Sequence, residues 1–98
     1  MINDDGIDGS SRIAQSGLRR LMLKLPAQRQ RLRSLRVSAS WPSFRELFEA
    51  YDEACIALES FRRDDASSVV IKEYETLCGE LEAEIVRALD RLIIWPRD

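Results

Sequence analysis

The amino-acid sequence predicts an all-α protein built on an antiparallel two-helix hairpin. Two stretches, residues 43–62 and 67–94, carry apolar residues at alternating spacings of three and four, which places them on one side of a helix. The polar segment between these stretches has no apolar period, and so short a loop makes the two helices antiparallel. Ninety-eight residues suit one small domain.

The N-terminal part is expected to supply a tail and one or two short helices that pack on the open end of the hairpin. Residues 1–10 are rich in Gly, Asp and Ser and predict a flexible tail, followed by a single helical domain over residues 11–98. A first helix begins near Ser10 or Ser11, either of which can cap it, and ends before Pro26. Proline fits the first position of a second short helix, which extends to about Arg36. The predicted inward-facing residues are Ala14, Leu18, Leu21, Met22, Leu25, Leu32 and Leu35.

Local signals mark the helices of the hairpin. The Ser43 hydroxyl can cap the first turn while Glu46 reaches back to the Ser43 N–H, as in a capping box, and Ser67 can cap the second helix. Gly79 lies in the middle of that second helix, at a cost of roughly 1 kcal/mol relative to Ala, which a close helix contact would explain. The acidic residues of the first helix, including Asp52, are assigned to its outer faces. The facing stripes, with the spacing that coiled coils use, are Phe44, Leu47, Tyr51, Ala54, Leu58 and Phe61 against Ile71, Tyr74, Cys78, Leu81, Ile85, Ala88, Leu92 and Trp95.

The loop also predicts which residues face each other. Counting outward from it, Tyr51 lies near Cys78 and Phe44 lies near Ile85. Cys55 is then about one helical turn away from Cys78 across the hairpin, and we interpret both as buried free thiols. A disulfide would require a suitable Cα separation, and a reducing compartment disfavours it.

The second helix is the longer one, about 28 residues against about 19 at 1.5 Å per residue, so its last two turns overhang the first. The overhang is apolar on nearly every face, and an exposed patch of this kind marks a binding surface. Its cover is either the chain's own N-terminal part, another protein or a second copy of the chain, and a homodimer would pool two hairpins into a four-helix bundle. The candidate partner-binding residues are Leu89, Leu92, Ile93, Trp95 and Trp41.

Charge is divided between the two parts of the chain. Residues 1–40 hold eight basic and three acidic residues, whereas residues 41–98 hold seven and fourteen. Arg29, Arg33 and Arg36 share one side of the short second helix. They belong to a solvated face that pairs with the acidic hairpin, to a basic amphipathic helix on a membrane surface or, in the alternative function, to the nucleic-acid-binding face of an adaptor.

The hairpin region resembles a known family. Its motifs are WPSFRELF at 41–48, followed by Tyr51-Asp52, EYETL at 73–77 and LEAEI at 81–85. In these motifs, which span residues 32–93 with the basic lead-in, the chain is similar to the YdcH-like family of short bacterial helical-hairpin proteins. The resemblance implies a helical hairpin and supplies no activity, because the function of that family is unassigned. Tyr51 stands where a His is common in the family, and the second helix is Glu-rich where the family is often Lys-rich.

The residue types argue against an enzyme. The sequence has no histidine, which removes the commonest general base and most helical zinc and di-iron sites. Two isolated cysteines make no metal motif, and the glycines form no phosphate-binding loop, so we expect no metal and no cofactor. No apolar run approaches the ~18 residues of a membrane span, and we expect a cytoplasmic protein. The predicted function is a non-enzymatic protein–protein interaction or regulatory module.

Overall fold

The computed structural model describes residues 4–36 and 38–94, with side chains for residues 12–36 and 38–92. Within these ranges the chain contains no strand, so the predicted all-α fold class is confirmed. No helix among these residues is long and apolar enough to cross a membrane. The elements are α1 (Asp4–Lys24), a short 3-10 helix η1 (Pro26–Gln28), α2 (Arg29–Leu35), α3 (Trp41–Arg63) and α4 (Ser68–Ile94).

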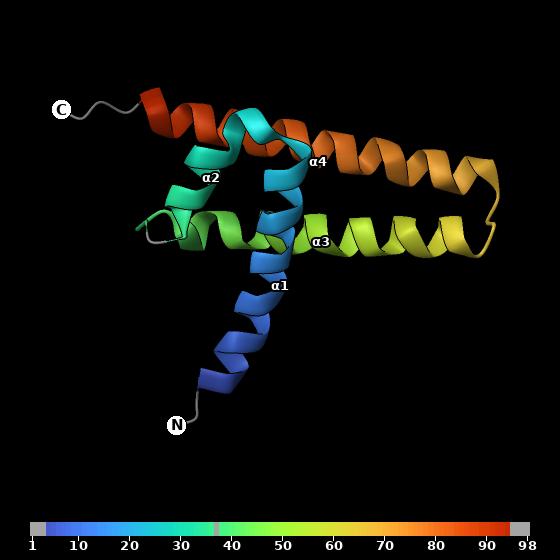
Figure 1. Cartoon of the computed structure of the whole chain (residues 1–98), viewed down its shortest axis with the longest axis horizontal. Helices are drawn as coiled ribbons and strands as arrows, with labels where there is room; N and C mark the ends of the chain where they lie inside the picture. The colour runs from blue at the N-terminus through green and yellow to red at the C-terminus, as the bar shows by residue number, and fades with distance from the viewer. Residues whose placement is uncertain (1–3, 37, 95–98) are drawn as a thin grey trace.

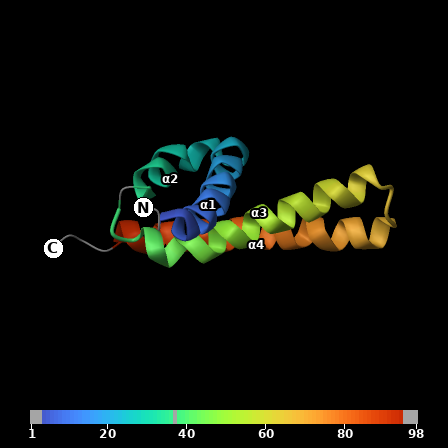
Figure 2. The ribbon, with the colours of Figure 1, turned by 90° about the horizontal axis from the view of Figure 1, so that it is seen from below.

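The helices are arranged in two layers. α3 and α4 lie side by side and run in opposite directions, with the turn between them at one end (Figure 1). α1 crosses this pair steeply, and α2 returns toward the end of the pair that is remote from the turn (Figure 1). In the view turned by 90°, the layer of α1 and α2 lies on one side of the layer that α3 and α4 form (Figure 2). One face of the hairpin is therefore covered by the chain itself over the part that is remote from the turn (Figure 2).

α1 is longer than the short helix that the sequence analysis expected. It begins at Asp4 and not near Ser10. The sequence allows this earlier start, because acidic residues are favoured in the first turns of a helix and Asp4, Asp5 and Asp8 stand at these positions. The flexible tail over residues 1–10 stays a prediction, and its residues 1–3 lie outside the described part of the chain.

The backbones of the two layers approach closely where α1 crosses α3 at Gly17. A Cβ atom on Gly17 would lie 2.0 Å from the Phe48 carbonyl oxygen, so only glycine allows the two backbones to approach this closely. Gly79, for which a close helix contact was expected, has no atom within 4 Å of such a Cβ position, and that explanation is wrong.

One hydrophobic core joins the layers. Phe48 is fully buried beside Gly17, and its ring packs against Trp41 and Phe44 at centroid distances of 5.5 and 5.8 Å. The predicted inward positions of the N-terminal helices are confirmed, since Ala14, Leu18, Leu21, Leu32 and Leu35 are buried and Met22 and Leu25 are partly buried. The other buried apolar residues are Phe44, Tyr51, Ala54, Leu58, Cys78, Ile85 and Leu89.

The hairpin helices begin where proline and serine allow it. α3 begins at Trp41, ahead of the expected Ser43, because Pro42 suits the first turn of a helix. Its N-cap is Ser40, which makes no side-chain cap bond, so the capping box expected from Ser43 is wrong. The Ser67 cap is confirmed, since the Val70 N–H donates to the Ser67 hydroxyl at 3.4 Å.

The facing register differs from the predicted one by about one helical turn. Tyr51 reaches Glu82 instead of Cys78, with a hydroxyl-to-carboxylate distance of 2.6 Å. Nearer the turn, the rings of Phe61 and Tyr74 meet at 5.0 Å. The reason is that helical side chains lean toward the N-terminus of their own helix. In this antiparallel pair the side chains of α3 lean away from the loop and those of α4 lean toward it, so a side chain of α3 meets a residue of α4 that is farther from the loop than backbone counting suggests.

Candidate functional site

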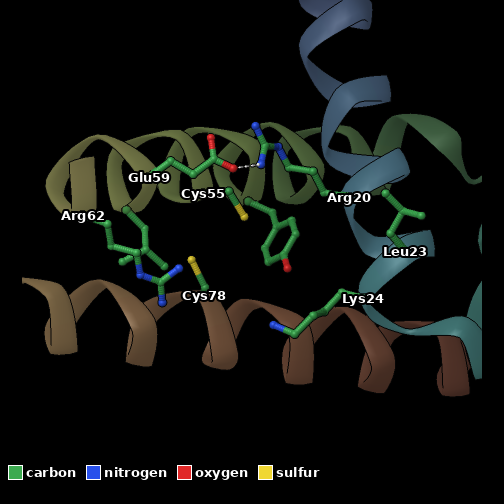
Figure 3. Close-up of a pocket in the computed structure, with 9 residues that line it drawn as sticks. Arg20, Leu23, Lys24, Cys55, Glu59, Arg62 and Cys78 are labelled. Atoms are coloured by element: carbon green, nitrogen blue, oxygen red, sulfur yellow. Dashed lines mark hydrogen bonds and ion pairs between the residues drawn. The ribbon is translucent and has the colours of Figure 1, made fainter.

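A hollow lies between the C-terminal half of α1 and the middle of the hairpin. It is a pocket of about 360 Å³ that α1, α3 and α4 all line. Side chains from the three helices converge on it (Figure 3). Its polar, charged and thiol side chains are Arg20, Lys24, Tyr51, Cys55, Glu59, Arg62 and Cys78.

A short polar chain closes one side of this pocket. The Tyr51 hydroxyl donates to Glu82 Oε2 at 2.6 Å, and Lys24 Nζ donates to the same oxygen at 3.0 Å. Burial, together with the hydrogen bond to Glu82, raises the pKa of Tyr51 well above its ordinary value, so the hydroxyl stays protonated. Glu82 therefore connects α4 to both other helices of the pocket.

A second chain anchors α1 to α3. Asp52, which the sequence analysis assigned to an outer face, has only 4% of its surface exposed. Its Oδ1 accepts hydrogen bonds from Ser16 Oγ at 2.6 Å and Arg20 Nε at 2.8 Å. These two bonds compensate for the loss of water, so the carboxylate can be buried. The Arg20 guanidinium also donates to Glu59 Oε2 at 2.7 Å. These bonds raise the pKa of Arg20, and the Arg20 hydrogen bond lowers the pKa of Glu59.

Two thiols complete the pocket. Cys55 on α3 is half-buried and Cys78 on α4 is buried, and their sulfur atoms both point into the space between the helices (Figure 3). Burial and the neighbouring Cys55 thiol raise the pKa of Cys78 to about 11, so it is protonated at neutral pH.

The pocket supplies polar contacts and thiols and shows no activated base. Its cations Arg20, Lys24 and Arg62 are each held by a carboxylate. Among the residues that the structure describes, no three Cys, Asp or Glu side chains gather closely enough to hold a metal ion. The arrangement is therefore suited to holding the three helices together.

The predicted partner-binding residues lie at the other end of the hairpin. Leu89 is 2% exposed and belongs to the core, while Leu92 and Trp41 are partly buried against it. Leu89 and Leu92 line a pocket of about 220 Å³ together with residues of α2 and its C-terminal turn. The Ile93 side chain and Trp95 lie outside the described residues. α3 and α4 have 23 and 27 residues, so their lengths differ by less than expected.

The predicted nucleic-acid-binding residues remain at the surface. Arg29, Arg33 and Arg36 are all exposed, and within residues 12–36 and 38–92 none of them forms an ion pair. Other basic residues of the N-terminal layer do pair with the acidic hairpin. These are Arg20, Lys24 and Arg31, the last with Asp90 at 3.0 Å.

Sequence reasoning missed a groove on the uncovered face of the hairpin. It has a volume of about 310 Å³ and is lined by residues of α3 and α4 alone. Ala50 and Ala57 lie two positions before Asp52 and Glu59, about 200° around α3 from the side that α1 covers. The signal in the sequence that could have indicated this groove is the small side chains of Ala50, Ala54 and Ala57 on one side of α3, opposite Leu77 of α4. The lining residues are Ala50, Glu53, Ala54, Ala57, Tyr74, Leu77 and Leu81.

Carboxylates border this groove. Glu53 lines it, and Glu73 and Glu80 lie four residues before and three residues after Leu77, on the same side of α4. Glu84 continues the same side one turn farther on. None of these four carboxylates forms an ion pair within the part of the chain whose side chains are described.

No protein-family model, curated protein or solved structure matches the chain. The resemblance to the YdcH-like family is therefore carried by the sequence motifs and stays a prediction.

Proposed function

We propose that this chain is a non-enzymatic protein–protein interaction module, which holds a basic amphipathic helix of a partner protein in the groove between α3 and α4. The observation that carries the proposal is the combination of an apolar groove with unpaired carboxylates along its border. Leu77 is 39% exposed in this groove, and burying it would favour binding. A regulatory role and a cytoplasmic location belong to the same proposal.

The chain's own α1 supports this choice of partner. α1 buries Ala14, Leu18 and Leu21 against the hairpin and sends Arg20 and Lys24 to acidic residues of α3 and α4. The opposite face of the hairpin offers the same combination of an apolar surface and carboxylates. Charge complementarity therefore favours a helix with apolar residues on one side and Lys or Arg beside them.

Binding of a defined peptide tests the proposal. The probe is a fluorescent 18-residue amphipathic helix of Leu and Lys, titrated by anisotropy with the wild-type protein and with the Leu77→Asp variant. We expect Leu77→Asp to weaken binding at least tenfold, which is about 1.4 kcal/mol, because it removes the central apolar contact.

The matched control is Val69→Asp, which places the same new charge on an exposed position of α4 outside the groove. It should bind at least as tightly as wild type, because it adds only attraction for a basic peptide. A peptide with the same composition in scrambled order should bind weakly. Equal affinities for the two variants, or for the two peptides, would show that net charge alone holds the peptide and would refute the proposal.

A second copy of the chain is the alternative partner. Association through the groove would bring the carboxylates of two copies together, which charge repulsion opposes. Association through the open end, near Leu92 and Leu35, would instead give the dimeric four-helix bundle. Light scattering detects a dimer of either kind, because the monomer has a mass of 11.3 kDa, and the Leu92→Glu variant distinguishes the two modes of association. A dimer that Leu92→Glu converts to monomer would replace the groove proposal with this arrangement.

A nucleic-acid-binding adaptor is the second candidate function. The observation in its favour is that Arg29, Arg33 and Arg36 have no carboxylate partner among the described side chains, although the hairpin is acidic. It predicts that RNA or DNA binds at low salt and that affinity falls steeply as salt increases. Replacing all three arginines with Gln should abolish this binding, and a lack of binding by the wild type at low salt would eliminate the candidate.

A further inference from the structure

The register of the antiparallel helices α3 and α4 places the two cysteines opposite each other. Tyr51 is bonded to Glu82 across the hairpin at 2.6 Å. Cys55 lies four residues after Tyr51 and Cys78 four residues before Glu82. Because the helices are antiparallel, both steps move about 6 Å in the same direction along the pair.

A second contact connects the two helices on the side of the turn. Arg62 on α3 bonds to Glu75 on α4 at 2.7 Å, so the thiols lie between two observed connections of the hairpin. Helix axes in contact are about 8–10 Å apart and Cα atoms lie about 2.3 Å from each axis. Positions that face each other directly can therefore reach the Cα separation of about 4.4–6.8 Å that a disulfide requires.

We propose that Cys55 and Cys78 are a redox-active pair that forms a reversible disulfide between α3 and α4, with a small peroxide as the oxidant. The pocket that both cysteines line has a volume of about 360 Å³, roughly ten times that of a water molecule, and Cys55 is only half-buried in it. A peroxide therefore has room to reach the sulfur atoms. The formation of this disulfide does not depend on the proposed function.

The two thiols have different parts in the reaction because they differ in exposure. Cys55 is half-buried and lines the pocket, so it is the thiol that meets the peroxide, whereas Cys78 is only 6% exposed. The Cys55 thiolate attacks one peroxide oxygen, which breaks the O–O bond, leaves a sulfenic acid on Cys55 and releases water after protonation. Cys78 sulfur then attacks the Cys55 sulfur and expels a second water. In total two thiols lose two electrons and two protons, and one hydrogen peroxide becomes two waters.

The disulfide would fix the separation of the two helices at the middle of the hairpin. It would close a loop from residue 55 to residue 78 and restrict the unfolded chain. We expect the oxidised protein to unfold at a temperature roughly 10–20 °C higher than the reduced protein. Ala54 and Leu77, which are adjacent in sequence to the two cysteines, line the groove on the other face. If the proposed function holds, oxidation would therefore also alter peptide affinity.

Oxidation of the full chain followed by mass spectrometry tests the proposal. The protein is treated with a twofold excess of hydrogen peroxide, unfolded and alkylated with N-ethylmaleimide. We expect a monomer two mass units lighter than the reduced protein that takes up no maleimide, and two maleimides after treatment with dithiothreitol. The cross-link should form at least tenfold faster in the native protein than in urea, because the fold holds the thiols together.

The variants Cys55→Ser and Cys78→Ser are the controls, and each should keep one thiol and form no intramolecular cross-link. Their circular dichroism spectra check that the fold is retained. Three results would overturn the proposal: sulfinic acid as the main product, a disulfide formed only between two chains, or a cross-linking rate no higher in the native state than in urea. None of these results bears on peptide binding at the groove, which the Leu77 experiment measures in the reduced protein.

Discussion

The two helical glycines give opposite predictions for the same substitution. Gly17→Ala should destabilise the protein, whereas Gly79→Ala should stabilise it. Both changes replace a glycine in the interior of a helix, so both gain about 1 kcal/mol of helix propensity. Any difference in sign must come from the space around the new methyl group.

The magnitude follows from the crossing of α1 and α3. The new Cβ at position 17 would lie 2.0 Å from the Phe48 carbonyl oxygen, so the backbones must separate by about 1 Å or more to reach ordinary contact. A gap of this size forfeits roughly a quarter to a half of each dispersion contact across the interface, and overpacking typically costs about 1–3 kcal/mol. Leu18 and Leu21, which are buried in the same interface, lose part of their packing. We expect a net loss of roughly 2 kcal/mol, a large part of the 5–15 kcal/mol typical of a domain.

Thermal unfolding followed by circular dichroism at 222 nm measures both variants. At about 4–8 °C per kcal/mol for a domain of this size, Gly17→Ala should lower Tm by roughly 8–16 °C. Gly79→Ala should raise it by roughly 4–8 °C. If Gly17→Ala unfolds at or above the wild-type temperature while Gly79→Ala behaves as expected, α1 does not cross α3 at this contact, and the two-layer arrangement is wrong.

Three further predictions concern the polar groups between the layers. Asp52→Ala should lower the free energy of unfolding by roughly 2–3 kcal/mol in urea denaturation, because it removes the acceptor that the Ser16 hydroxyl shares with Arg20 Nε; a change below 0.5 kcal/mol would contradict the buried anchor. The free energy of unfolding should fall as the pH rises above about 9–10, because the pKa values of Tyr51 and Cys78 are higher in the folded than in the unfolded protein. The stability that these two protonated groups contribute is complete below their unfolded pKa values and is lost as the pH rises above them. Tyr51→Phe should reduce this alkaline loss in denaturation curves between pH 8 and 11, and an unchanged pH dependence would show that Tyr51 is not responsible.

Local patterns were sufficient to predict the fold class and most of the core. The inward positions of α1 and α2, such as Leu18 and Leu32, follow from a spacing that repeats within one helix. The start of α3 was misplaced by two residues because the expected capping box at Ser43 competed with the preference of Pro42 for a first turn. Such errors arise where two local rules disagree.

The remaining features depend on contacts between helices, which no local rule contains. Gly17 shares a helix face with Ala14 and Leu21, and this small residue on an apolar face was the one available sign of a close crossing. The sequence analysis places Asp52 on an outer face because the donors to its carboxylate, Ser16 and Arg20, lie more than 30 positions earlier in the chain. A local pattern contains no sign of them. To predict that Cys55 faces Cys78, the direction in which helical side chains lean must be taken into account in addition to the number of residues counted from the loop.

The layered construction also has a consequence for how the native chain opens. α4 meets the N-terminal layer partly through ion pairs at the surface, Lys24 with Glu82 and Arg31 with Asp90, in which Lys24 and Asp90 are more than half exposed. Such pairs contribute little, so the attachment of α1 depends mainly on its narrow crossing of α3. Detachment of the N-terminal layer would then be a sub-global event that leaves the hairpin helical, and backbone amides of α1 should exchange with deuterium before those in the middle of α3. The N-terminal layer would then open first, while the hairpin of α3 and α4 stays folded.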